Sequence, residues 1–413
     1  MTTALHQQRM IRNILFLLFA LPGLSFASWV ARTPAVRDAL NVSTAGMGII
    51  IFALAIGSLT GLLTAGSVIA RKGARLVIMI SSLMIVIGFV AIGIGASVKV
   101  TAIVMVGLFI FGCGFGAAEV GLNMEGSAVE KALNKILLPA FHGFFSVGTL
   151  AGAAIGVGAE AIQLPIIVHF SVLALLIAVT LWYCFRYLPE ATGKEPAQTV
   201  GHKGGALKKQ LKVWTEKRTL LIGVMVLGMA FAEGSANDWL PLIMVDGYGV
   251  SALTGSFIYG LFVAAMTIGR FAGGWILDRY GRVRVLAGCA ISAVLGLVLV
   301  IWGQHYILSA MGVVLWGLGA SLGFPVGLSA AGDEPEGAAA RVGAVATSGY
   351  IASLVGPPAL GFLGEHFGLL NAMIAVLIGV MISGSLIRWA RPSDEPNTPF
   401  GQEKDGVIPK DIA

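Results

Sequence analysis

Long apolar runs alternate with short polar connections along the whole chain. A run of roughly 18–25 apolar residues crosses a bilayer core as an α-helix, because a helix satisfies every backbone hydrogen bond within its own segment. A polar stretch at 188–218 separates the sixth run from the seventh, and a polar tail occupies 391–413. The pattern predicts an all-α polytopic membrane protein with twelve transmembrane helices, near 13–31, 46–69, 76–96, 101–123, 139–159, 165–187, 219–240, 252–276, 284–303, 306–329, 342–363 and 368–390.

The first apolar run has a second interpretation. Arg9 and Arg12 precede a stretch that begins at Ile14, and this order of residues also occurs in secretory signals. The stretch continues to Val30, which is long for a signal, and many further apolar runs follow it. We therefore expect a retained first helix.

The composition excludes a soluble globule. Apolar residues make up 57% and charged residues 12% of the chain, whereas soluble domains carry about 25% charged residues. The net charge of +6 does not indicate a nucleic-acid partner, since the basic residues lie in short connections rather than on one face. The sequence contains no phosphate-cradling Gly-x4-Gly-Lys-Ser/Thr motif, no His/Glu metal cluster and no nucleophile–base spacing, so we expect no cofactor and no enzymatic activity.

Lysine and arginine are distributed unevenly over the two sides of the predicted bundle. With the N-terminus inside, 24 of the 27 basic residues fall on the cytoplasmic side, a count that places Arg270 at the cytoplasmic end of the eighth helix. Arg32, Arg37 and Lys99 remain outside. Because cytoplasmic segments carry the excess of basic residues in membrane proteins, we expect both termini in the cytoplasm.

One short connection occurs twice. Gly274–Arg282 lies between the eighth and ninth runs, and a partial copy, Gly66–Arg75, lies between the second and third. Further pairs of positions correspond between the halves: Trp29 with Trp239, 120–123 with 326–329, and Gly152 with Gly356. The chain is therefore predicted to contain two six-helix bundles, 1–187 and 219–390, joined by the cytoplasmic linker 188–218 and followed by the tail 391–413.

The repeated connection resembles the cytoplasmic signature of the major facilitator superfamily, Gly-x-x-x-Asp-Arg-x-Gly-Arg. The second copy matches that signature at Gly274, Asp278, Arg279, Gly281 and Arg282. The first copy has Ala70 in place of the aspartate and keeps Gly66, Arg71, Gly73 and the later base Arg75. The resemblance implies a secondary transporter of the bacterial inner membrane whose halves rock about a midplane site. It also implies a small-molecule substrate, a lipid bilayer around a monomeric chain, and an inner gate held mainly from the second half.

Two shorter stretches carry narrower resemblances. The segment 231–241, Phe-Ala-Glu-Gly-Ser-Ala-Asn-Asp-Trp-Leu-Pro, looks like the YbjJ-type inner-membrane members of the superfamily. The pair Glu119-x3-Asn123 resembles a fourth-helix motif of fucose–proton symporters, in which the acid is linked to proton coupling. Antiporters of the superfamily usually carry a proline after the central glycine of the fifth helix. Ala153 occupies that position here, which disfavours a drug antiporter.

Ionisable residues inside predicted spans are functional candidates, because each costs about 2.5–3.5 kcal/mol at mid-helix. Glu119 is the foremost of them, and Asn123 shares its helix face one turn on. A carboxyl group in low dielectric holds its proton more tightly than in water, so Glu119 is suited to loading and releasing a proton near neutral pH. A structural hydrogen bond to a neighbouring helix is the alternative.

Three further ionisable or polar positions are candidates. His142 is expected at the depth of Glu119, where the two side chains would form a proton relay, although a histidine hydrogen-bonded at a helix start explains it equally well. Glu233 and Asn237 share a face of the seventh helix and are candidates for contact with the proton and the substrate.

Gate residues are expected at both ends of the bundle. Asp238 turns about 100° away from Glu233 and Asn237, and we expect it to pair with Arg32 as an outer gate. At the inner end, we expect Arg270, Asp278 and Arg279 to form a charge network that latches the gate.

Aromatic side chains complete the predicted cavity, since rings suit sugars or flat organic solutes. The substrate-binding candidates of this kind are Trp29, Phe145, Tyr259, Trp316 and Tyr350. Trp29 and its counterpart Trp239 have an alternative as interface anchors, because Trp near helix ends often lies at the membrane surface.

The favoured function is proton-coupled symport of a small polar solute, such as a sugar or an organic metabolite, with Glu119 exchanging protons together with His142 or Glu233. A proton-driven exporter of drugs or metabolites would use the same acids in the opposite sense and is the alternative. A membrane receptor or scaffold would need no buried acids, and a membrane enzyme would need a catalytic constellation that the sequence lacks.

Overall fold

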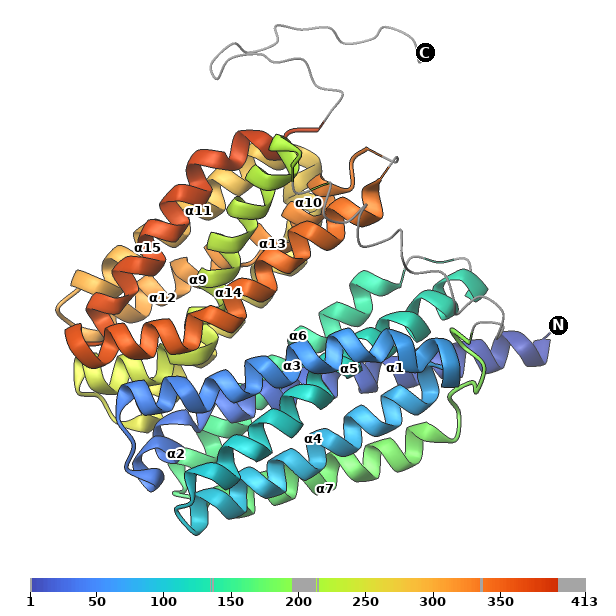
Figure 1. Ribbon diagram of the computed structural model, residues 1–413, viewed down its shortest axis with the longest axis horizontal. Coiled ribbons are helices and arrows are strands. Elements are labelled where there is room, and N and C mark those ends of the chain that lie inside the picture. Colours follow the sequence, from blue (N-terminus) through green and yellow to red (C-terminus); the bar gives the residue numbers. More distant parts are fainter. Residues whose placement is uncertain are drawn as a thin grey trace, which may run out of the picture.

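The computed structural model describes residues 2–133, 135, 137–194, 213, 215–334 and 337–392, and Figure 1 shows two groups of helices that meet at one end and diverge at the other. The first group contains α1 (Thr2–Ala31), α2 (Thr33–Leu40), α3 (Thr44–Lys72), α4 (Ala74–Ser97), α5 (Thr101–Leu133), α6 (Leu138–Ala161) and α7 (Ile166–Phe185). The second contains α9 (Lys217–Tyr248), α10 (Ala252–Tyr280), α11 (Arg282–Trp302), α12 (Tyr306–Ala320), α13 (Gly323–Ala331), α14 (Ala338–Phe367), α15 (Leu369–Leu386) and the short η1 (Ile387–Ala390). Most of the linker 188–218 and the tail from 393, with Lys404 and Lys410, lie outside the described residues.

The predicted spans fall on these helices, so the all-α polytopic fold is confirmed. Within the described part of the chain, eleven spans are long and apolar enough to cross a membrane, and α12 and α13 together form one of them. The remaining predicted span corresponds to α14, which has 30 residues and two internal prolines. Its many glycine, alanine and serine residues make it less apolar than the others, because small side chains carry little apolar surface.

Two features were not predicted. The helix α5 continues ten residues beyond its predicted end at 123, to Leu133, because a helix extends past the bilayer core into polar turns that hydropathy does not register. A short helix, α2, follows α1 directly, with Pro34 in its first turn and Val36 and Leu40 buried. Eight residues are too few for a helical period to stand out from the apolar runs on either side.

The repeated connection makes the same turn in both halves. Gly73 lies between α3 and α4 with φ 90° and ψ 160°, and Gly281 lies between α10 and α11 with φ 75° and ψ 159°. This combination of angles is essentially restricted to glycine, because a Cβ atom would clash with the backbone. The signature glycine is therefore required by the turn itself, whatever else the connection does.

A stripe of glycines brings α6 against α1. A Cβ atom on Gly148 would lie 2.0 Å from the carbonyl oxygen of Ala20, and one on Gly152 would lie 2.2 Å from that of Leu24. Since only hydrogen fits in these gaps, the two helix backbones approach as closely as small-residue stripes in membranes allow. The three glycines of Gly148-x3-Gly152-x3-Gly156 lie on one face of α6, where this close packing requires them.

The tenth predicted span is broken rather than continuous, because α12 ends at Ala320 and α13 begins at Gly323. Pro325 accounts for the break. Proline has no N–H, so the carbonyl of Ser321, four residues earlier, loses its helical donor and is pushed away by the proline ring. The three glycines of Gly319-x3-Gly323-x3-Gly327 consequently do not lie on one face: Gly319 packs on α11, whereas the other two pack on α9.

The two groups of helices touch through α3 with α14 and through α6 with α10. We call the end where α7 stops and α9 starts the linker face, and the opposite end, which carries α2, the far face (Figure 1). Several polar contacts between described residues join the halves at the far face. Arg37 forms an ion pair with Asp246, the backbone N–H of Ala45 donates to Glu365 Oε2 at 3.1 Å, and Ser256 Oγ donates to the Ala31 carbonyl at 2.6 Å. The far face is therefore closed.

Candidate functional site

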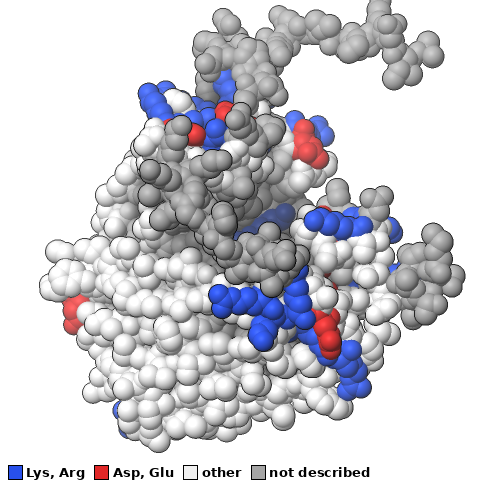
Figure 2. Space-filling view, turned by 45° about the vertical axis from the view of Figure 1, so that its right-hand side comes forward, with Lys and Arg blue, Asp and Glu red and all other residues white. Residues whose placement is uncertain are grey.

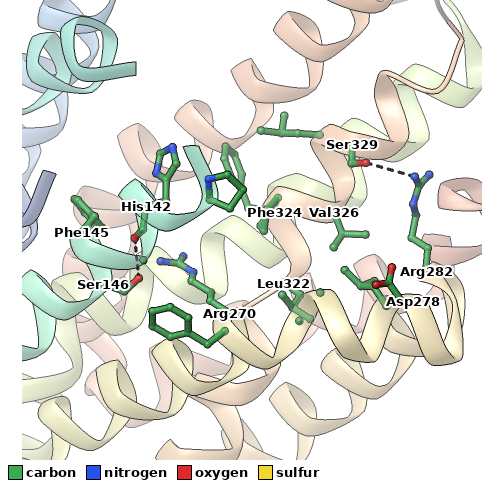
Figure 3. Close-up of a pocket in the computed structure, with 18 of the residues that line it drawn as sticks. His142, Phe145, Ser146, Arg270, Asp278, Arg282, Leu322, Phe324, Val326 and Ser329 are labelled. Atoms are coloured by element: carbon green, nitrogen blue, oxygen red, sulfur yellow. Dashed lines mark hydrogen bonds between the residues drawn. The ribbon is translucent and has the colours of Figure 1, made fainter. Parts of the chain in front are cut away.

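A cavity of about 1340 Å³ lies between the two groups of helices. It reaches from Phe115 and Glu119 to Arg284 and Arg391 at the linker face, and α1, α5, α6, α10, α11 and α13 supply its wall. Figure 3 shows side chains of both halves directed into it. The cavity opens on the linker face and ends below the closed far face, so a solute can enter it from one side only.

Glu119 and Asn123 lie on the cavity face of α5, one turn apart, as their spacing predicted. The Glu119 side chain is exposed to the cavity. His142 Nε2 lies 3.1 Å from Asn123 Oδ1, so the histidine pairs with the amide and not with Glu119. The expected Glu119–His142 relay is therefore not a direct contact, although both residues line the same cavity.

Arg270 and Glu233 form an ion pair at mid-height in the second half. Arg270 Nη2 donates to Glu233 Oε1 at 2.6 Å, and the two side chains are 28% and 21% exposed. The predicted position of Arg270, at the cytoplasmic end of the eighth helix, was wrong. It lies ten residues before Tyr280, the last residue of α10, which is about 15 Å inside the helix end. Hydropathy cannot separate an arginine near a helix end from one inside a span that faces a cavity.

The Arg270 guanidinium is held in place by two elements. Its Nε donates to the Ser321 carbonyl at 3.4 Å, which is the carbonyl that Pro325 leaves without a helical partner. Gly269 makes room for this contact, because a Cβ there would lie 2.4 Å from Ser321 Oγ. The break between α12 and α13 and the glycine on α10 therefore position one charged side chain at the cavity wall.

The predicted latch residues lie at the linker face but do not bind one another. Asp278 is exposed and lines the cavity, and no ion pair joins it to Arg270 or Arg279 among the described residues. The Arg279 guanidinium lies 5.7 Å from the ring centroids of Trp275 and Tyr280. The expected network of Arg270, Asp278 and Arg279 is therefore not formed in this open state.

Arg282 belongs instead to a network that the sequence did not indicate. Its Nη1 donates to Asp333 Oδ1 at 3.0 Å and to Oδ2 at 2.8 Å, and Arg218 Nη2 donates to the same carboxylate at 2.7 Å. Asp333 follows α13 in a connection with no helical or strand period, so its neighbours could not be inferred from the chain.

The partial copy of the repeated connection, Gly66–Arg75, also lies at the linker face. Gly66 and Arg71 are exposed on α3. Arg75 Nη1 donates to Glu190 Oε1 at 2.7 Å, which ties the first copy to the residues that follow α7. The Cα of Gly66 and that of Gly274 both have open space on the side where a Cβ would stand.

The expected outer-gate pair of Arg32 and Asp238 is wrong. Arg32 Nη1 lies 3.1 Å from Glu160 Oε2, and Arg32 Nη2 donates to the Leu164 carbonyl at 2.8 Å, so its partners belong to its own half. Burial lowers the pKa of the Arg32 guanidinium, and the charge of Glu160 opposes that effect. The inter-half ion pair at the far face is formed by Arg37 and Asp246 instead.

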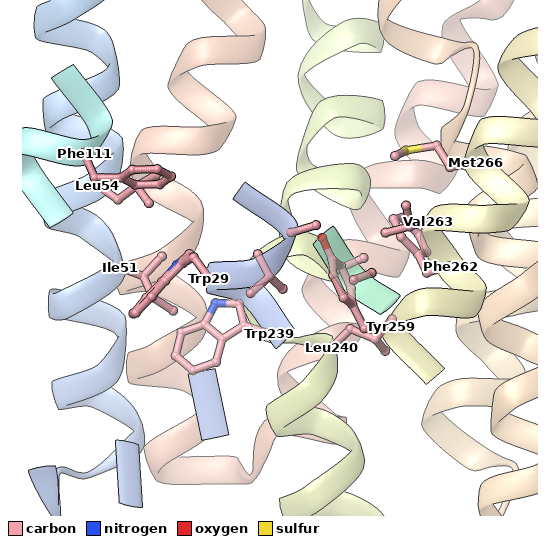
Figure 4. Packing of buried hydrophobic residues seen from close by; sticks show 14 of the residues in the cluster. Trp29, Ile51, Leu54, Phe111, Trp239, Leu240, Tyr259, Phe262, Val263 and Met266 are labelled. Carbon is pink, nitrogen blue, oxygen red and sulfur yellow. The ribbon is translucent and has the colours of Figure 1, made fainter. Parts of the chain in front are cut away.

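The predicted aromatic lining is only partly correct. Phe145 lines the cavity. Trp29, Tyr259 and Trp316 are 2%, 0% and 0% exposed and belong to the apolar core, and Figure 4 shows Trp29 and Tyr259 among other buried side chains, with Trp239 beside Trp29. Large rings on inward helix faces pack between helices as readily as they face a cavity, and spacing does not distinguish the two.

The two remaining candidates lie outside the cavity wall. Asn237 Oδ1 accepts a hydrogen bond from the Tyr259 hydroxyl at 3.3 Å. Tyr350 does not line the cavity, but it lies within electrostatic range of Glu119. Four unpredicted phenylalanines do line it: Phe19, Phe115, Phe271 and Phe324. Phe115 was within reach of sequence reasoning, since it precedes Glu119 by one helical turn on the same face.

The amino-acid sequence matches a family model and a known relative over most of its length. A model of the Major Facilitator Superfamily matches residues 14–350 and, in an overlapping second match, 276–411. The chain is 30% identical over 373 residues to the uncharacterized transporter y4wD of Sinorhizobium fredii (strain NBRC 101917 / NGR234), covering 88% of this chain and 96% of the relative.

Solved structures share the fold. The nucleoside transporter NupG is similar with a TM-score of 0.69 and 16% identity, over 92% of this chain and 98% of that chain. FucP in its outward conformation is similar with a TM-score of 0.64 and 14% identity, over 93% and 99% of the two chains. At these identities the likeness concerns the fold alone.

Proposed function

The chain belongs to the major facilitator superfamily of membrane transporters, and from this premise we propose that it carries a small polar solute in symport with protons. The observation that supports this most directly is the Glu119 carboxyl group, which is exposed in the wall of a cavity open at one face only. The Asn123–His142 hydrogen bond lies one helical turn away. The narrower relationship to YbjJ-type members rests on the segment 231–241 and is part of the proposal.

The basic residues support an orientation. Most of the described lysines and arginines lie at helix ends on the linker face, among them Arg71, Arg186, Arg218, Arg279 and Arg388. Figure 2 shows basic side chains gathered around the hollow between the halves. Since basic residues are enriched on the cytoplasmic side, we place the linker face and both termini in the cytoplasm. The cavity is then open inward.

Proton coupling follows from the position of Glu119. In the inward-open state the carboxyl group meets water from the cytoplasm, where it can release a proton. When the halves rock to open the far face, the same group meets the other side and can be protonated there. Because a charged carboxylate in the membrane interior is costly and a protonated one is much less so, the solute-loaded carrier crosses most readily with Glu119 protonated, and the proton leaves with the solute before the empty carrier returns.

His142 and Glu233 have supporting parts in this scheme. His142 Nε2 donates to Asn123 Oδ1 and lines the same cavity as Glu119, where water can carry a proton between the two side chains. Glu233 is held by Arg270 and exchanges a proton only when that ion pair opens. The exposed residues Asp278, Arg279, Gly66 and Arg71 form the inner latch when the linker face closes. Each chain encloses a complete cavity, so a monomer is sufficient.

Solute accumulation in proteoliposomes tests the proposal. Purified protein is first screened by thermal shift against sugars, organic acids and drugs, and the compound that stabilises it most is then offered as a radiolabelled solute. We expect a pH gradient, acid outside, to drive accumulation by the wild type. Glu119→Gln should abolish that accumulation and leave solute exchange intact, because exchange needs no net proton movement.

Asp38→Asn is the matched control, since this acid is 64% exposed, lies outside the cavity and binds Arg37 within its own helix. It should accumulate solute like the wild type. The symport proposal fails if Glu119→Gln accumulates solute normally. Accumulation only with the opposite gradient, together with lipophilic cations as the stabilising compounds, identifies the proton-driven exporter instead.

A further inference from the structure

The structure assigns an anion-binding group to the cavity: we propose that the transported solute is a small organic acid whose carboxylate docks on the Arg270 guanidinium. This inference names the solute class for the transport proposed above and therefore rests on that function. It is carried by the contacts of Arg270, by its depth in the span, and by the apolar side chains around it.

Arg270 has unused donors that face the cavity. A guanidinium has five N–H groups, and Arg270 uses Nε for the Ser321 carbonyl and one Nη2 hydrogen for Glu233. Within the described residues no hydrogen bond from Nη1 is found, so the Nη1 and Nη2 end of the group keeps N–H donors for a ligand. With 28% of the side chain exposed and Arg270 in the cavity wall, this end matches the two oxygens of a carboxylate in a bidentate hydrogen bond.

The enrichment of basic residues on the cytoplasmic side does not explain the position of Arg270. Arginines at the mouth, such as Arg282 and Arg284, follow from the enrichment of basic residues on the cytoplasmic side. Arg270 lies about 15 Å deeper, where a charge is costly unless it is used. Ser321, freed by Pro325, and Glu233 fix it there, which is the support that a binding group requires.

The wall opposite and beside Arg270 is suited to the apolar body of such an acid. Figure 3 shows the guanidinium directed toward α6 and its residues His142, Phe145 and Ser146. Phe271 follows Arg270 on α10 and approaches α6 where Gly143 lacks a side chain: a Cβ there would lie 2.9 Å from the ring. Rings on two sides and one charged group between them favour a flat or cyclic acid over a polyhydroxylated sugar.

The charge of the cavity wall is consistent with an anionic solute. Its lining contains four arginines, Arg270, Arg282, Arg284 and Arg391, against the two carboxylates Glu119 and Asp278, while Glu233 and Asp333 pair with two of these arginines from behind the lining. A basic wall raises the local concentration of anions and repels lipophilic cations. Protonation of Glu119 would remove the carboxylate nearest the deep end of the cavity, so that an acid and a proton bind together without a net negative charge.

Matched acids and amides test the proposal directly. Benzoate, phenylacetate and cyclohexanecarboxylate are each compared with the corresponding amide, which has the same shape without the charge. Binding to purified wild-type protein is measured by thermal shift and by titration. We expect the acids to bind at least about tenfold more tightly than their amides, as one charge-assisted hydrogen bond predicts.

Two variants keep the test informative even if Arg270 alone is needed for folding. The double variant Arg270→Gln/Glu233→Gln leaves no unpaired charge and should lose the preference for acids. Glu233→Gln removes the competitor for the guanidinium and should bind the acids several times more tightly than the wild type does. The proposal is overturned if amides bind as well as acids, if no acid of the set binds, or if the double variant retains the preference.

The two proposals fail separately. Acids that bind through Arg270 but are not accumulated by a pH gradient contradict proton symport and leave the docking site in place. Accumulation of a neutral solute that depends on Glu119 contradicts the docking site and leaves proton coupling in place.

Discussion

Arg37 of α2 pairs with Asp246 of α9, and this contact joins the two halves of the molecule at the far face. The Arg37 and Asp246 side chains are 15% and 31% exposed, so water screens the pair only in part. The contact must break when the far face opens, because the two residues belong to different halves. It therefore contributes to the relative populations of the state open at the linker face and the state open at the far face.

Removing this ion pair should shift the population toward the outward-open state. A partly exposed pair contributes about 1 kcal/mol, so Asp246→Asn should raise the outward-open to inward-open ratio about fivefold. Spin labels at Ile162 and Phe367, which are 71% and 64% exposed near the ends of α6 and α14, report the opening as a longer distance. Asp38→Asn is the control, because Asp38 binds Arg37 within the same helix and its loss should leave the distances unchanged.

Glycine is required at the turn of the repeated connection. Gly281→Ala should destabilise the protein by about 1–3 kcal/mol, because φ 75° with ψ 159° is strained for any residue with a Cβ. Gly73→Ala should cost more than that, since the added Cβ would also lie 2.6 Å from the Glu190 carbonyl oxygen. Thermal unfolding in detergent measures both. Gly274→Ala, within α10 and with open space around it, should leave the melting temperature unchanged or raise it, and an equal loss in all three variants would contradict this account.

Pro325 should matter for binding more than for stability. Pro325→Ala restores an N–H that can donate to the Ser321 carbonyl, so α12 and α13 can join into one helix and Arg270 Nε loses its acceptor. We expect a melting temperature equal to or above that of the wild type, together with weaker binding of the acids in the matched set. Unchanged acid binding in a folded Pro325→Ala variant would show that the helix break does not position Arg270.

Asp278 should act when the linker face closes. In the open state it is exposed and without an ion pair among the described residues, so Asp278→Asn removes nothing from this state and destabilises only the closed one. We expect Asp278→Asn to increase the labelling rate of a cysteine introduced at Ser329 in the cavity wall, in a background without the native cysteines. Ala70→Asp should change that rate less, because the first copy of the connection lacks the aspartate. Equal rates in both variants would contradict an asymmetric latch.

Hydropathy and the repeated connection were sufficient to infer the fold. Runs of apolar residues locate the helices because the bilayer imposes their length, and the signature glycine marks a turn that the structure forms twice. The broken tenth span was also visible in principle, since Pro325 inside an apolar run removes a helical hydrogen bond. The length of that run fits a single span, so the apolar pattern alone predicts one continuous helix.

The candidate site was less accessible to sequence reasoning. Glu119 and Asn123 were placed on the cavity face because both lie on one helix, where spacing fixes their relative direction. The partner of Arg270 lies 37 positions earlier on a different helix, and no periodicity relates two helices to each other. The same limit explains why Arg32 was assigned to Asp238 rather than to Glu160, and why Trp316 was expected in the cavity wall.

Proton movement during solute uptake tests the central claim most directly. Proteoliposomes containing a pH-sensitive dye receive the stabilising solute from outside, with no initial pH gradient. We expect the interior of wild-type vesicles to acidify as solute enters, and Glu119→Gln vesicles to exchange solute with no change in internal pH. Acidification of the Glu119→Gln vesicles at the wild-type rate would contradict the assignment of proton coupling to this carboxyl group.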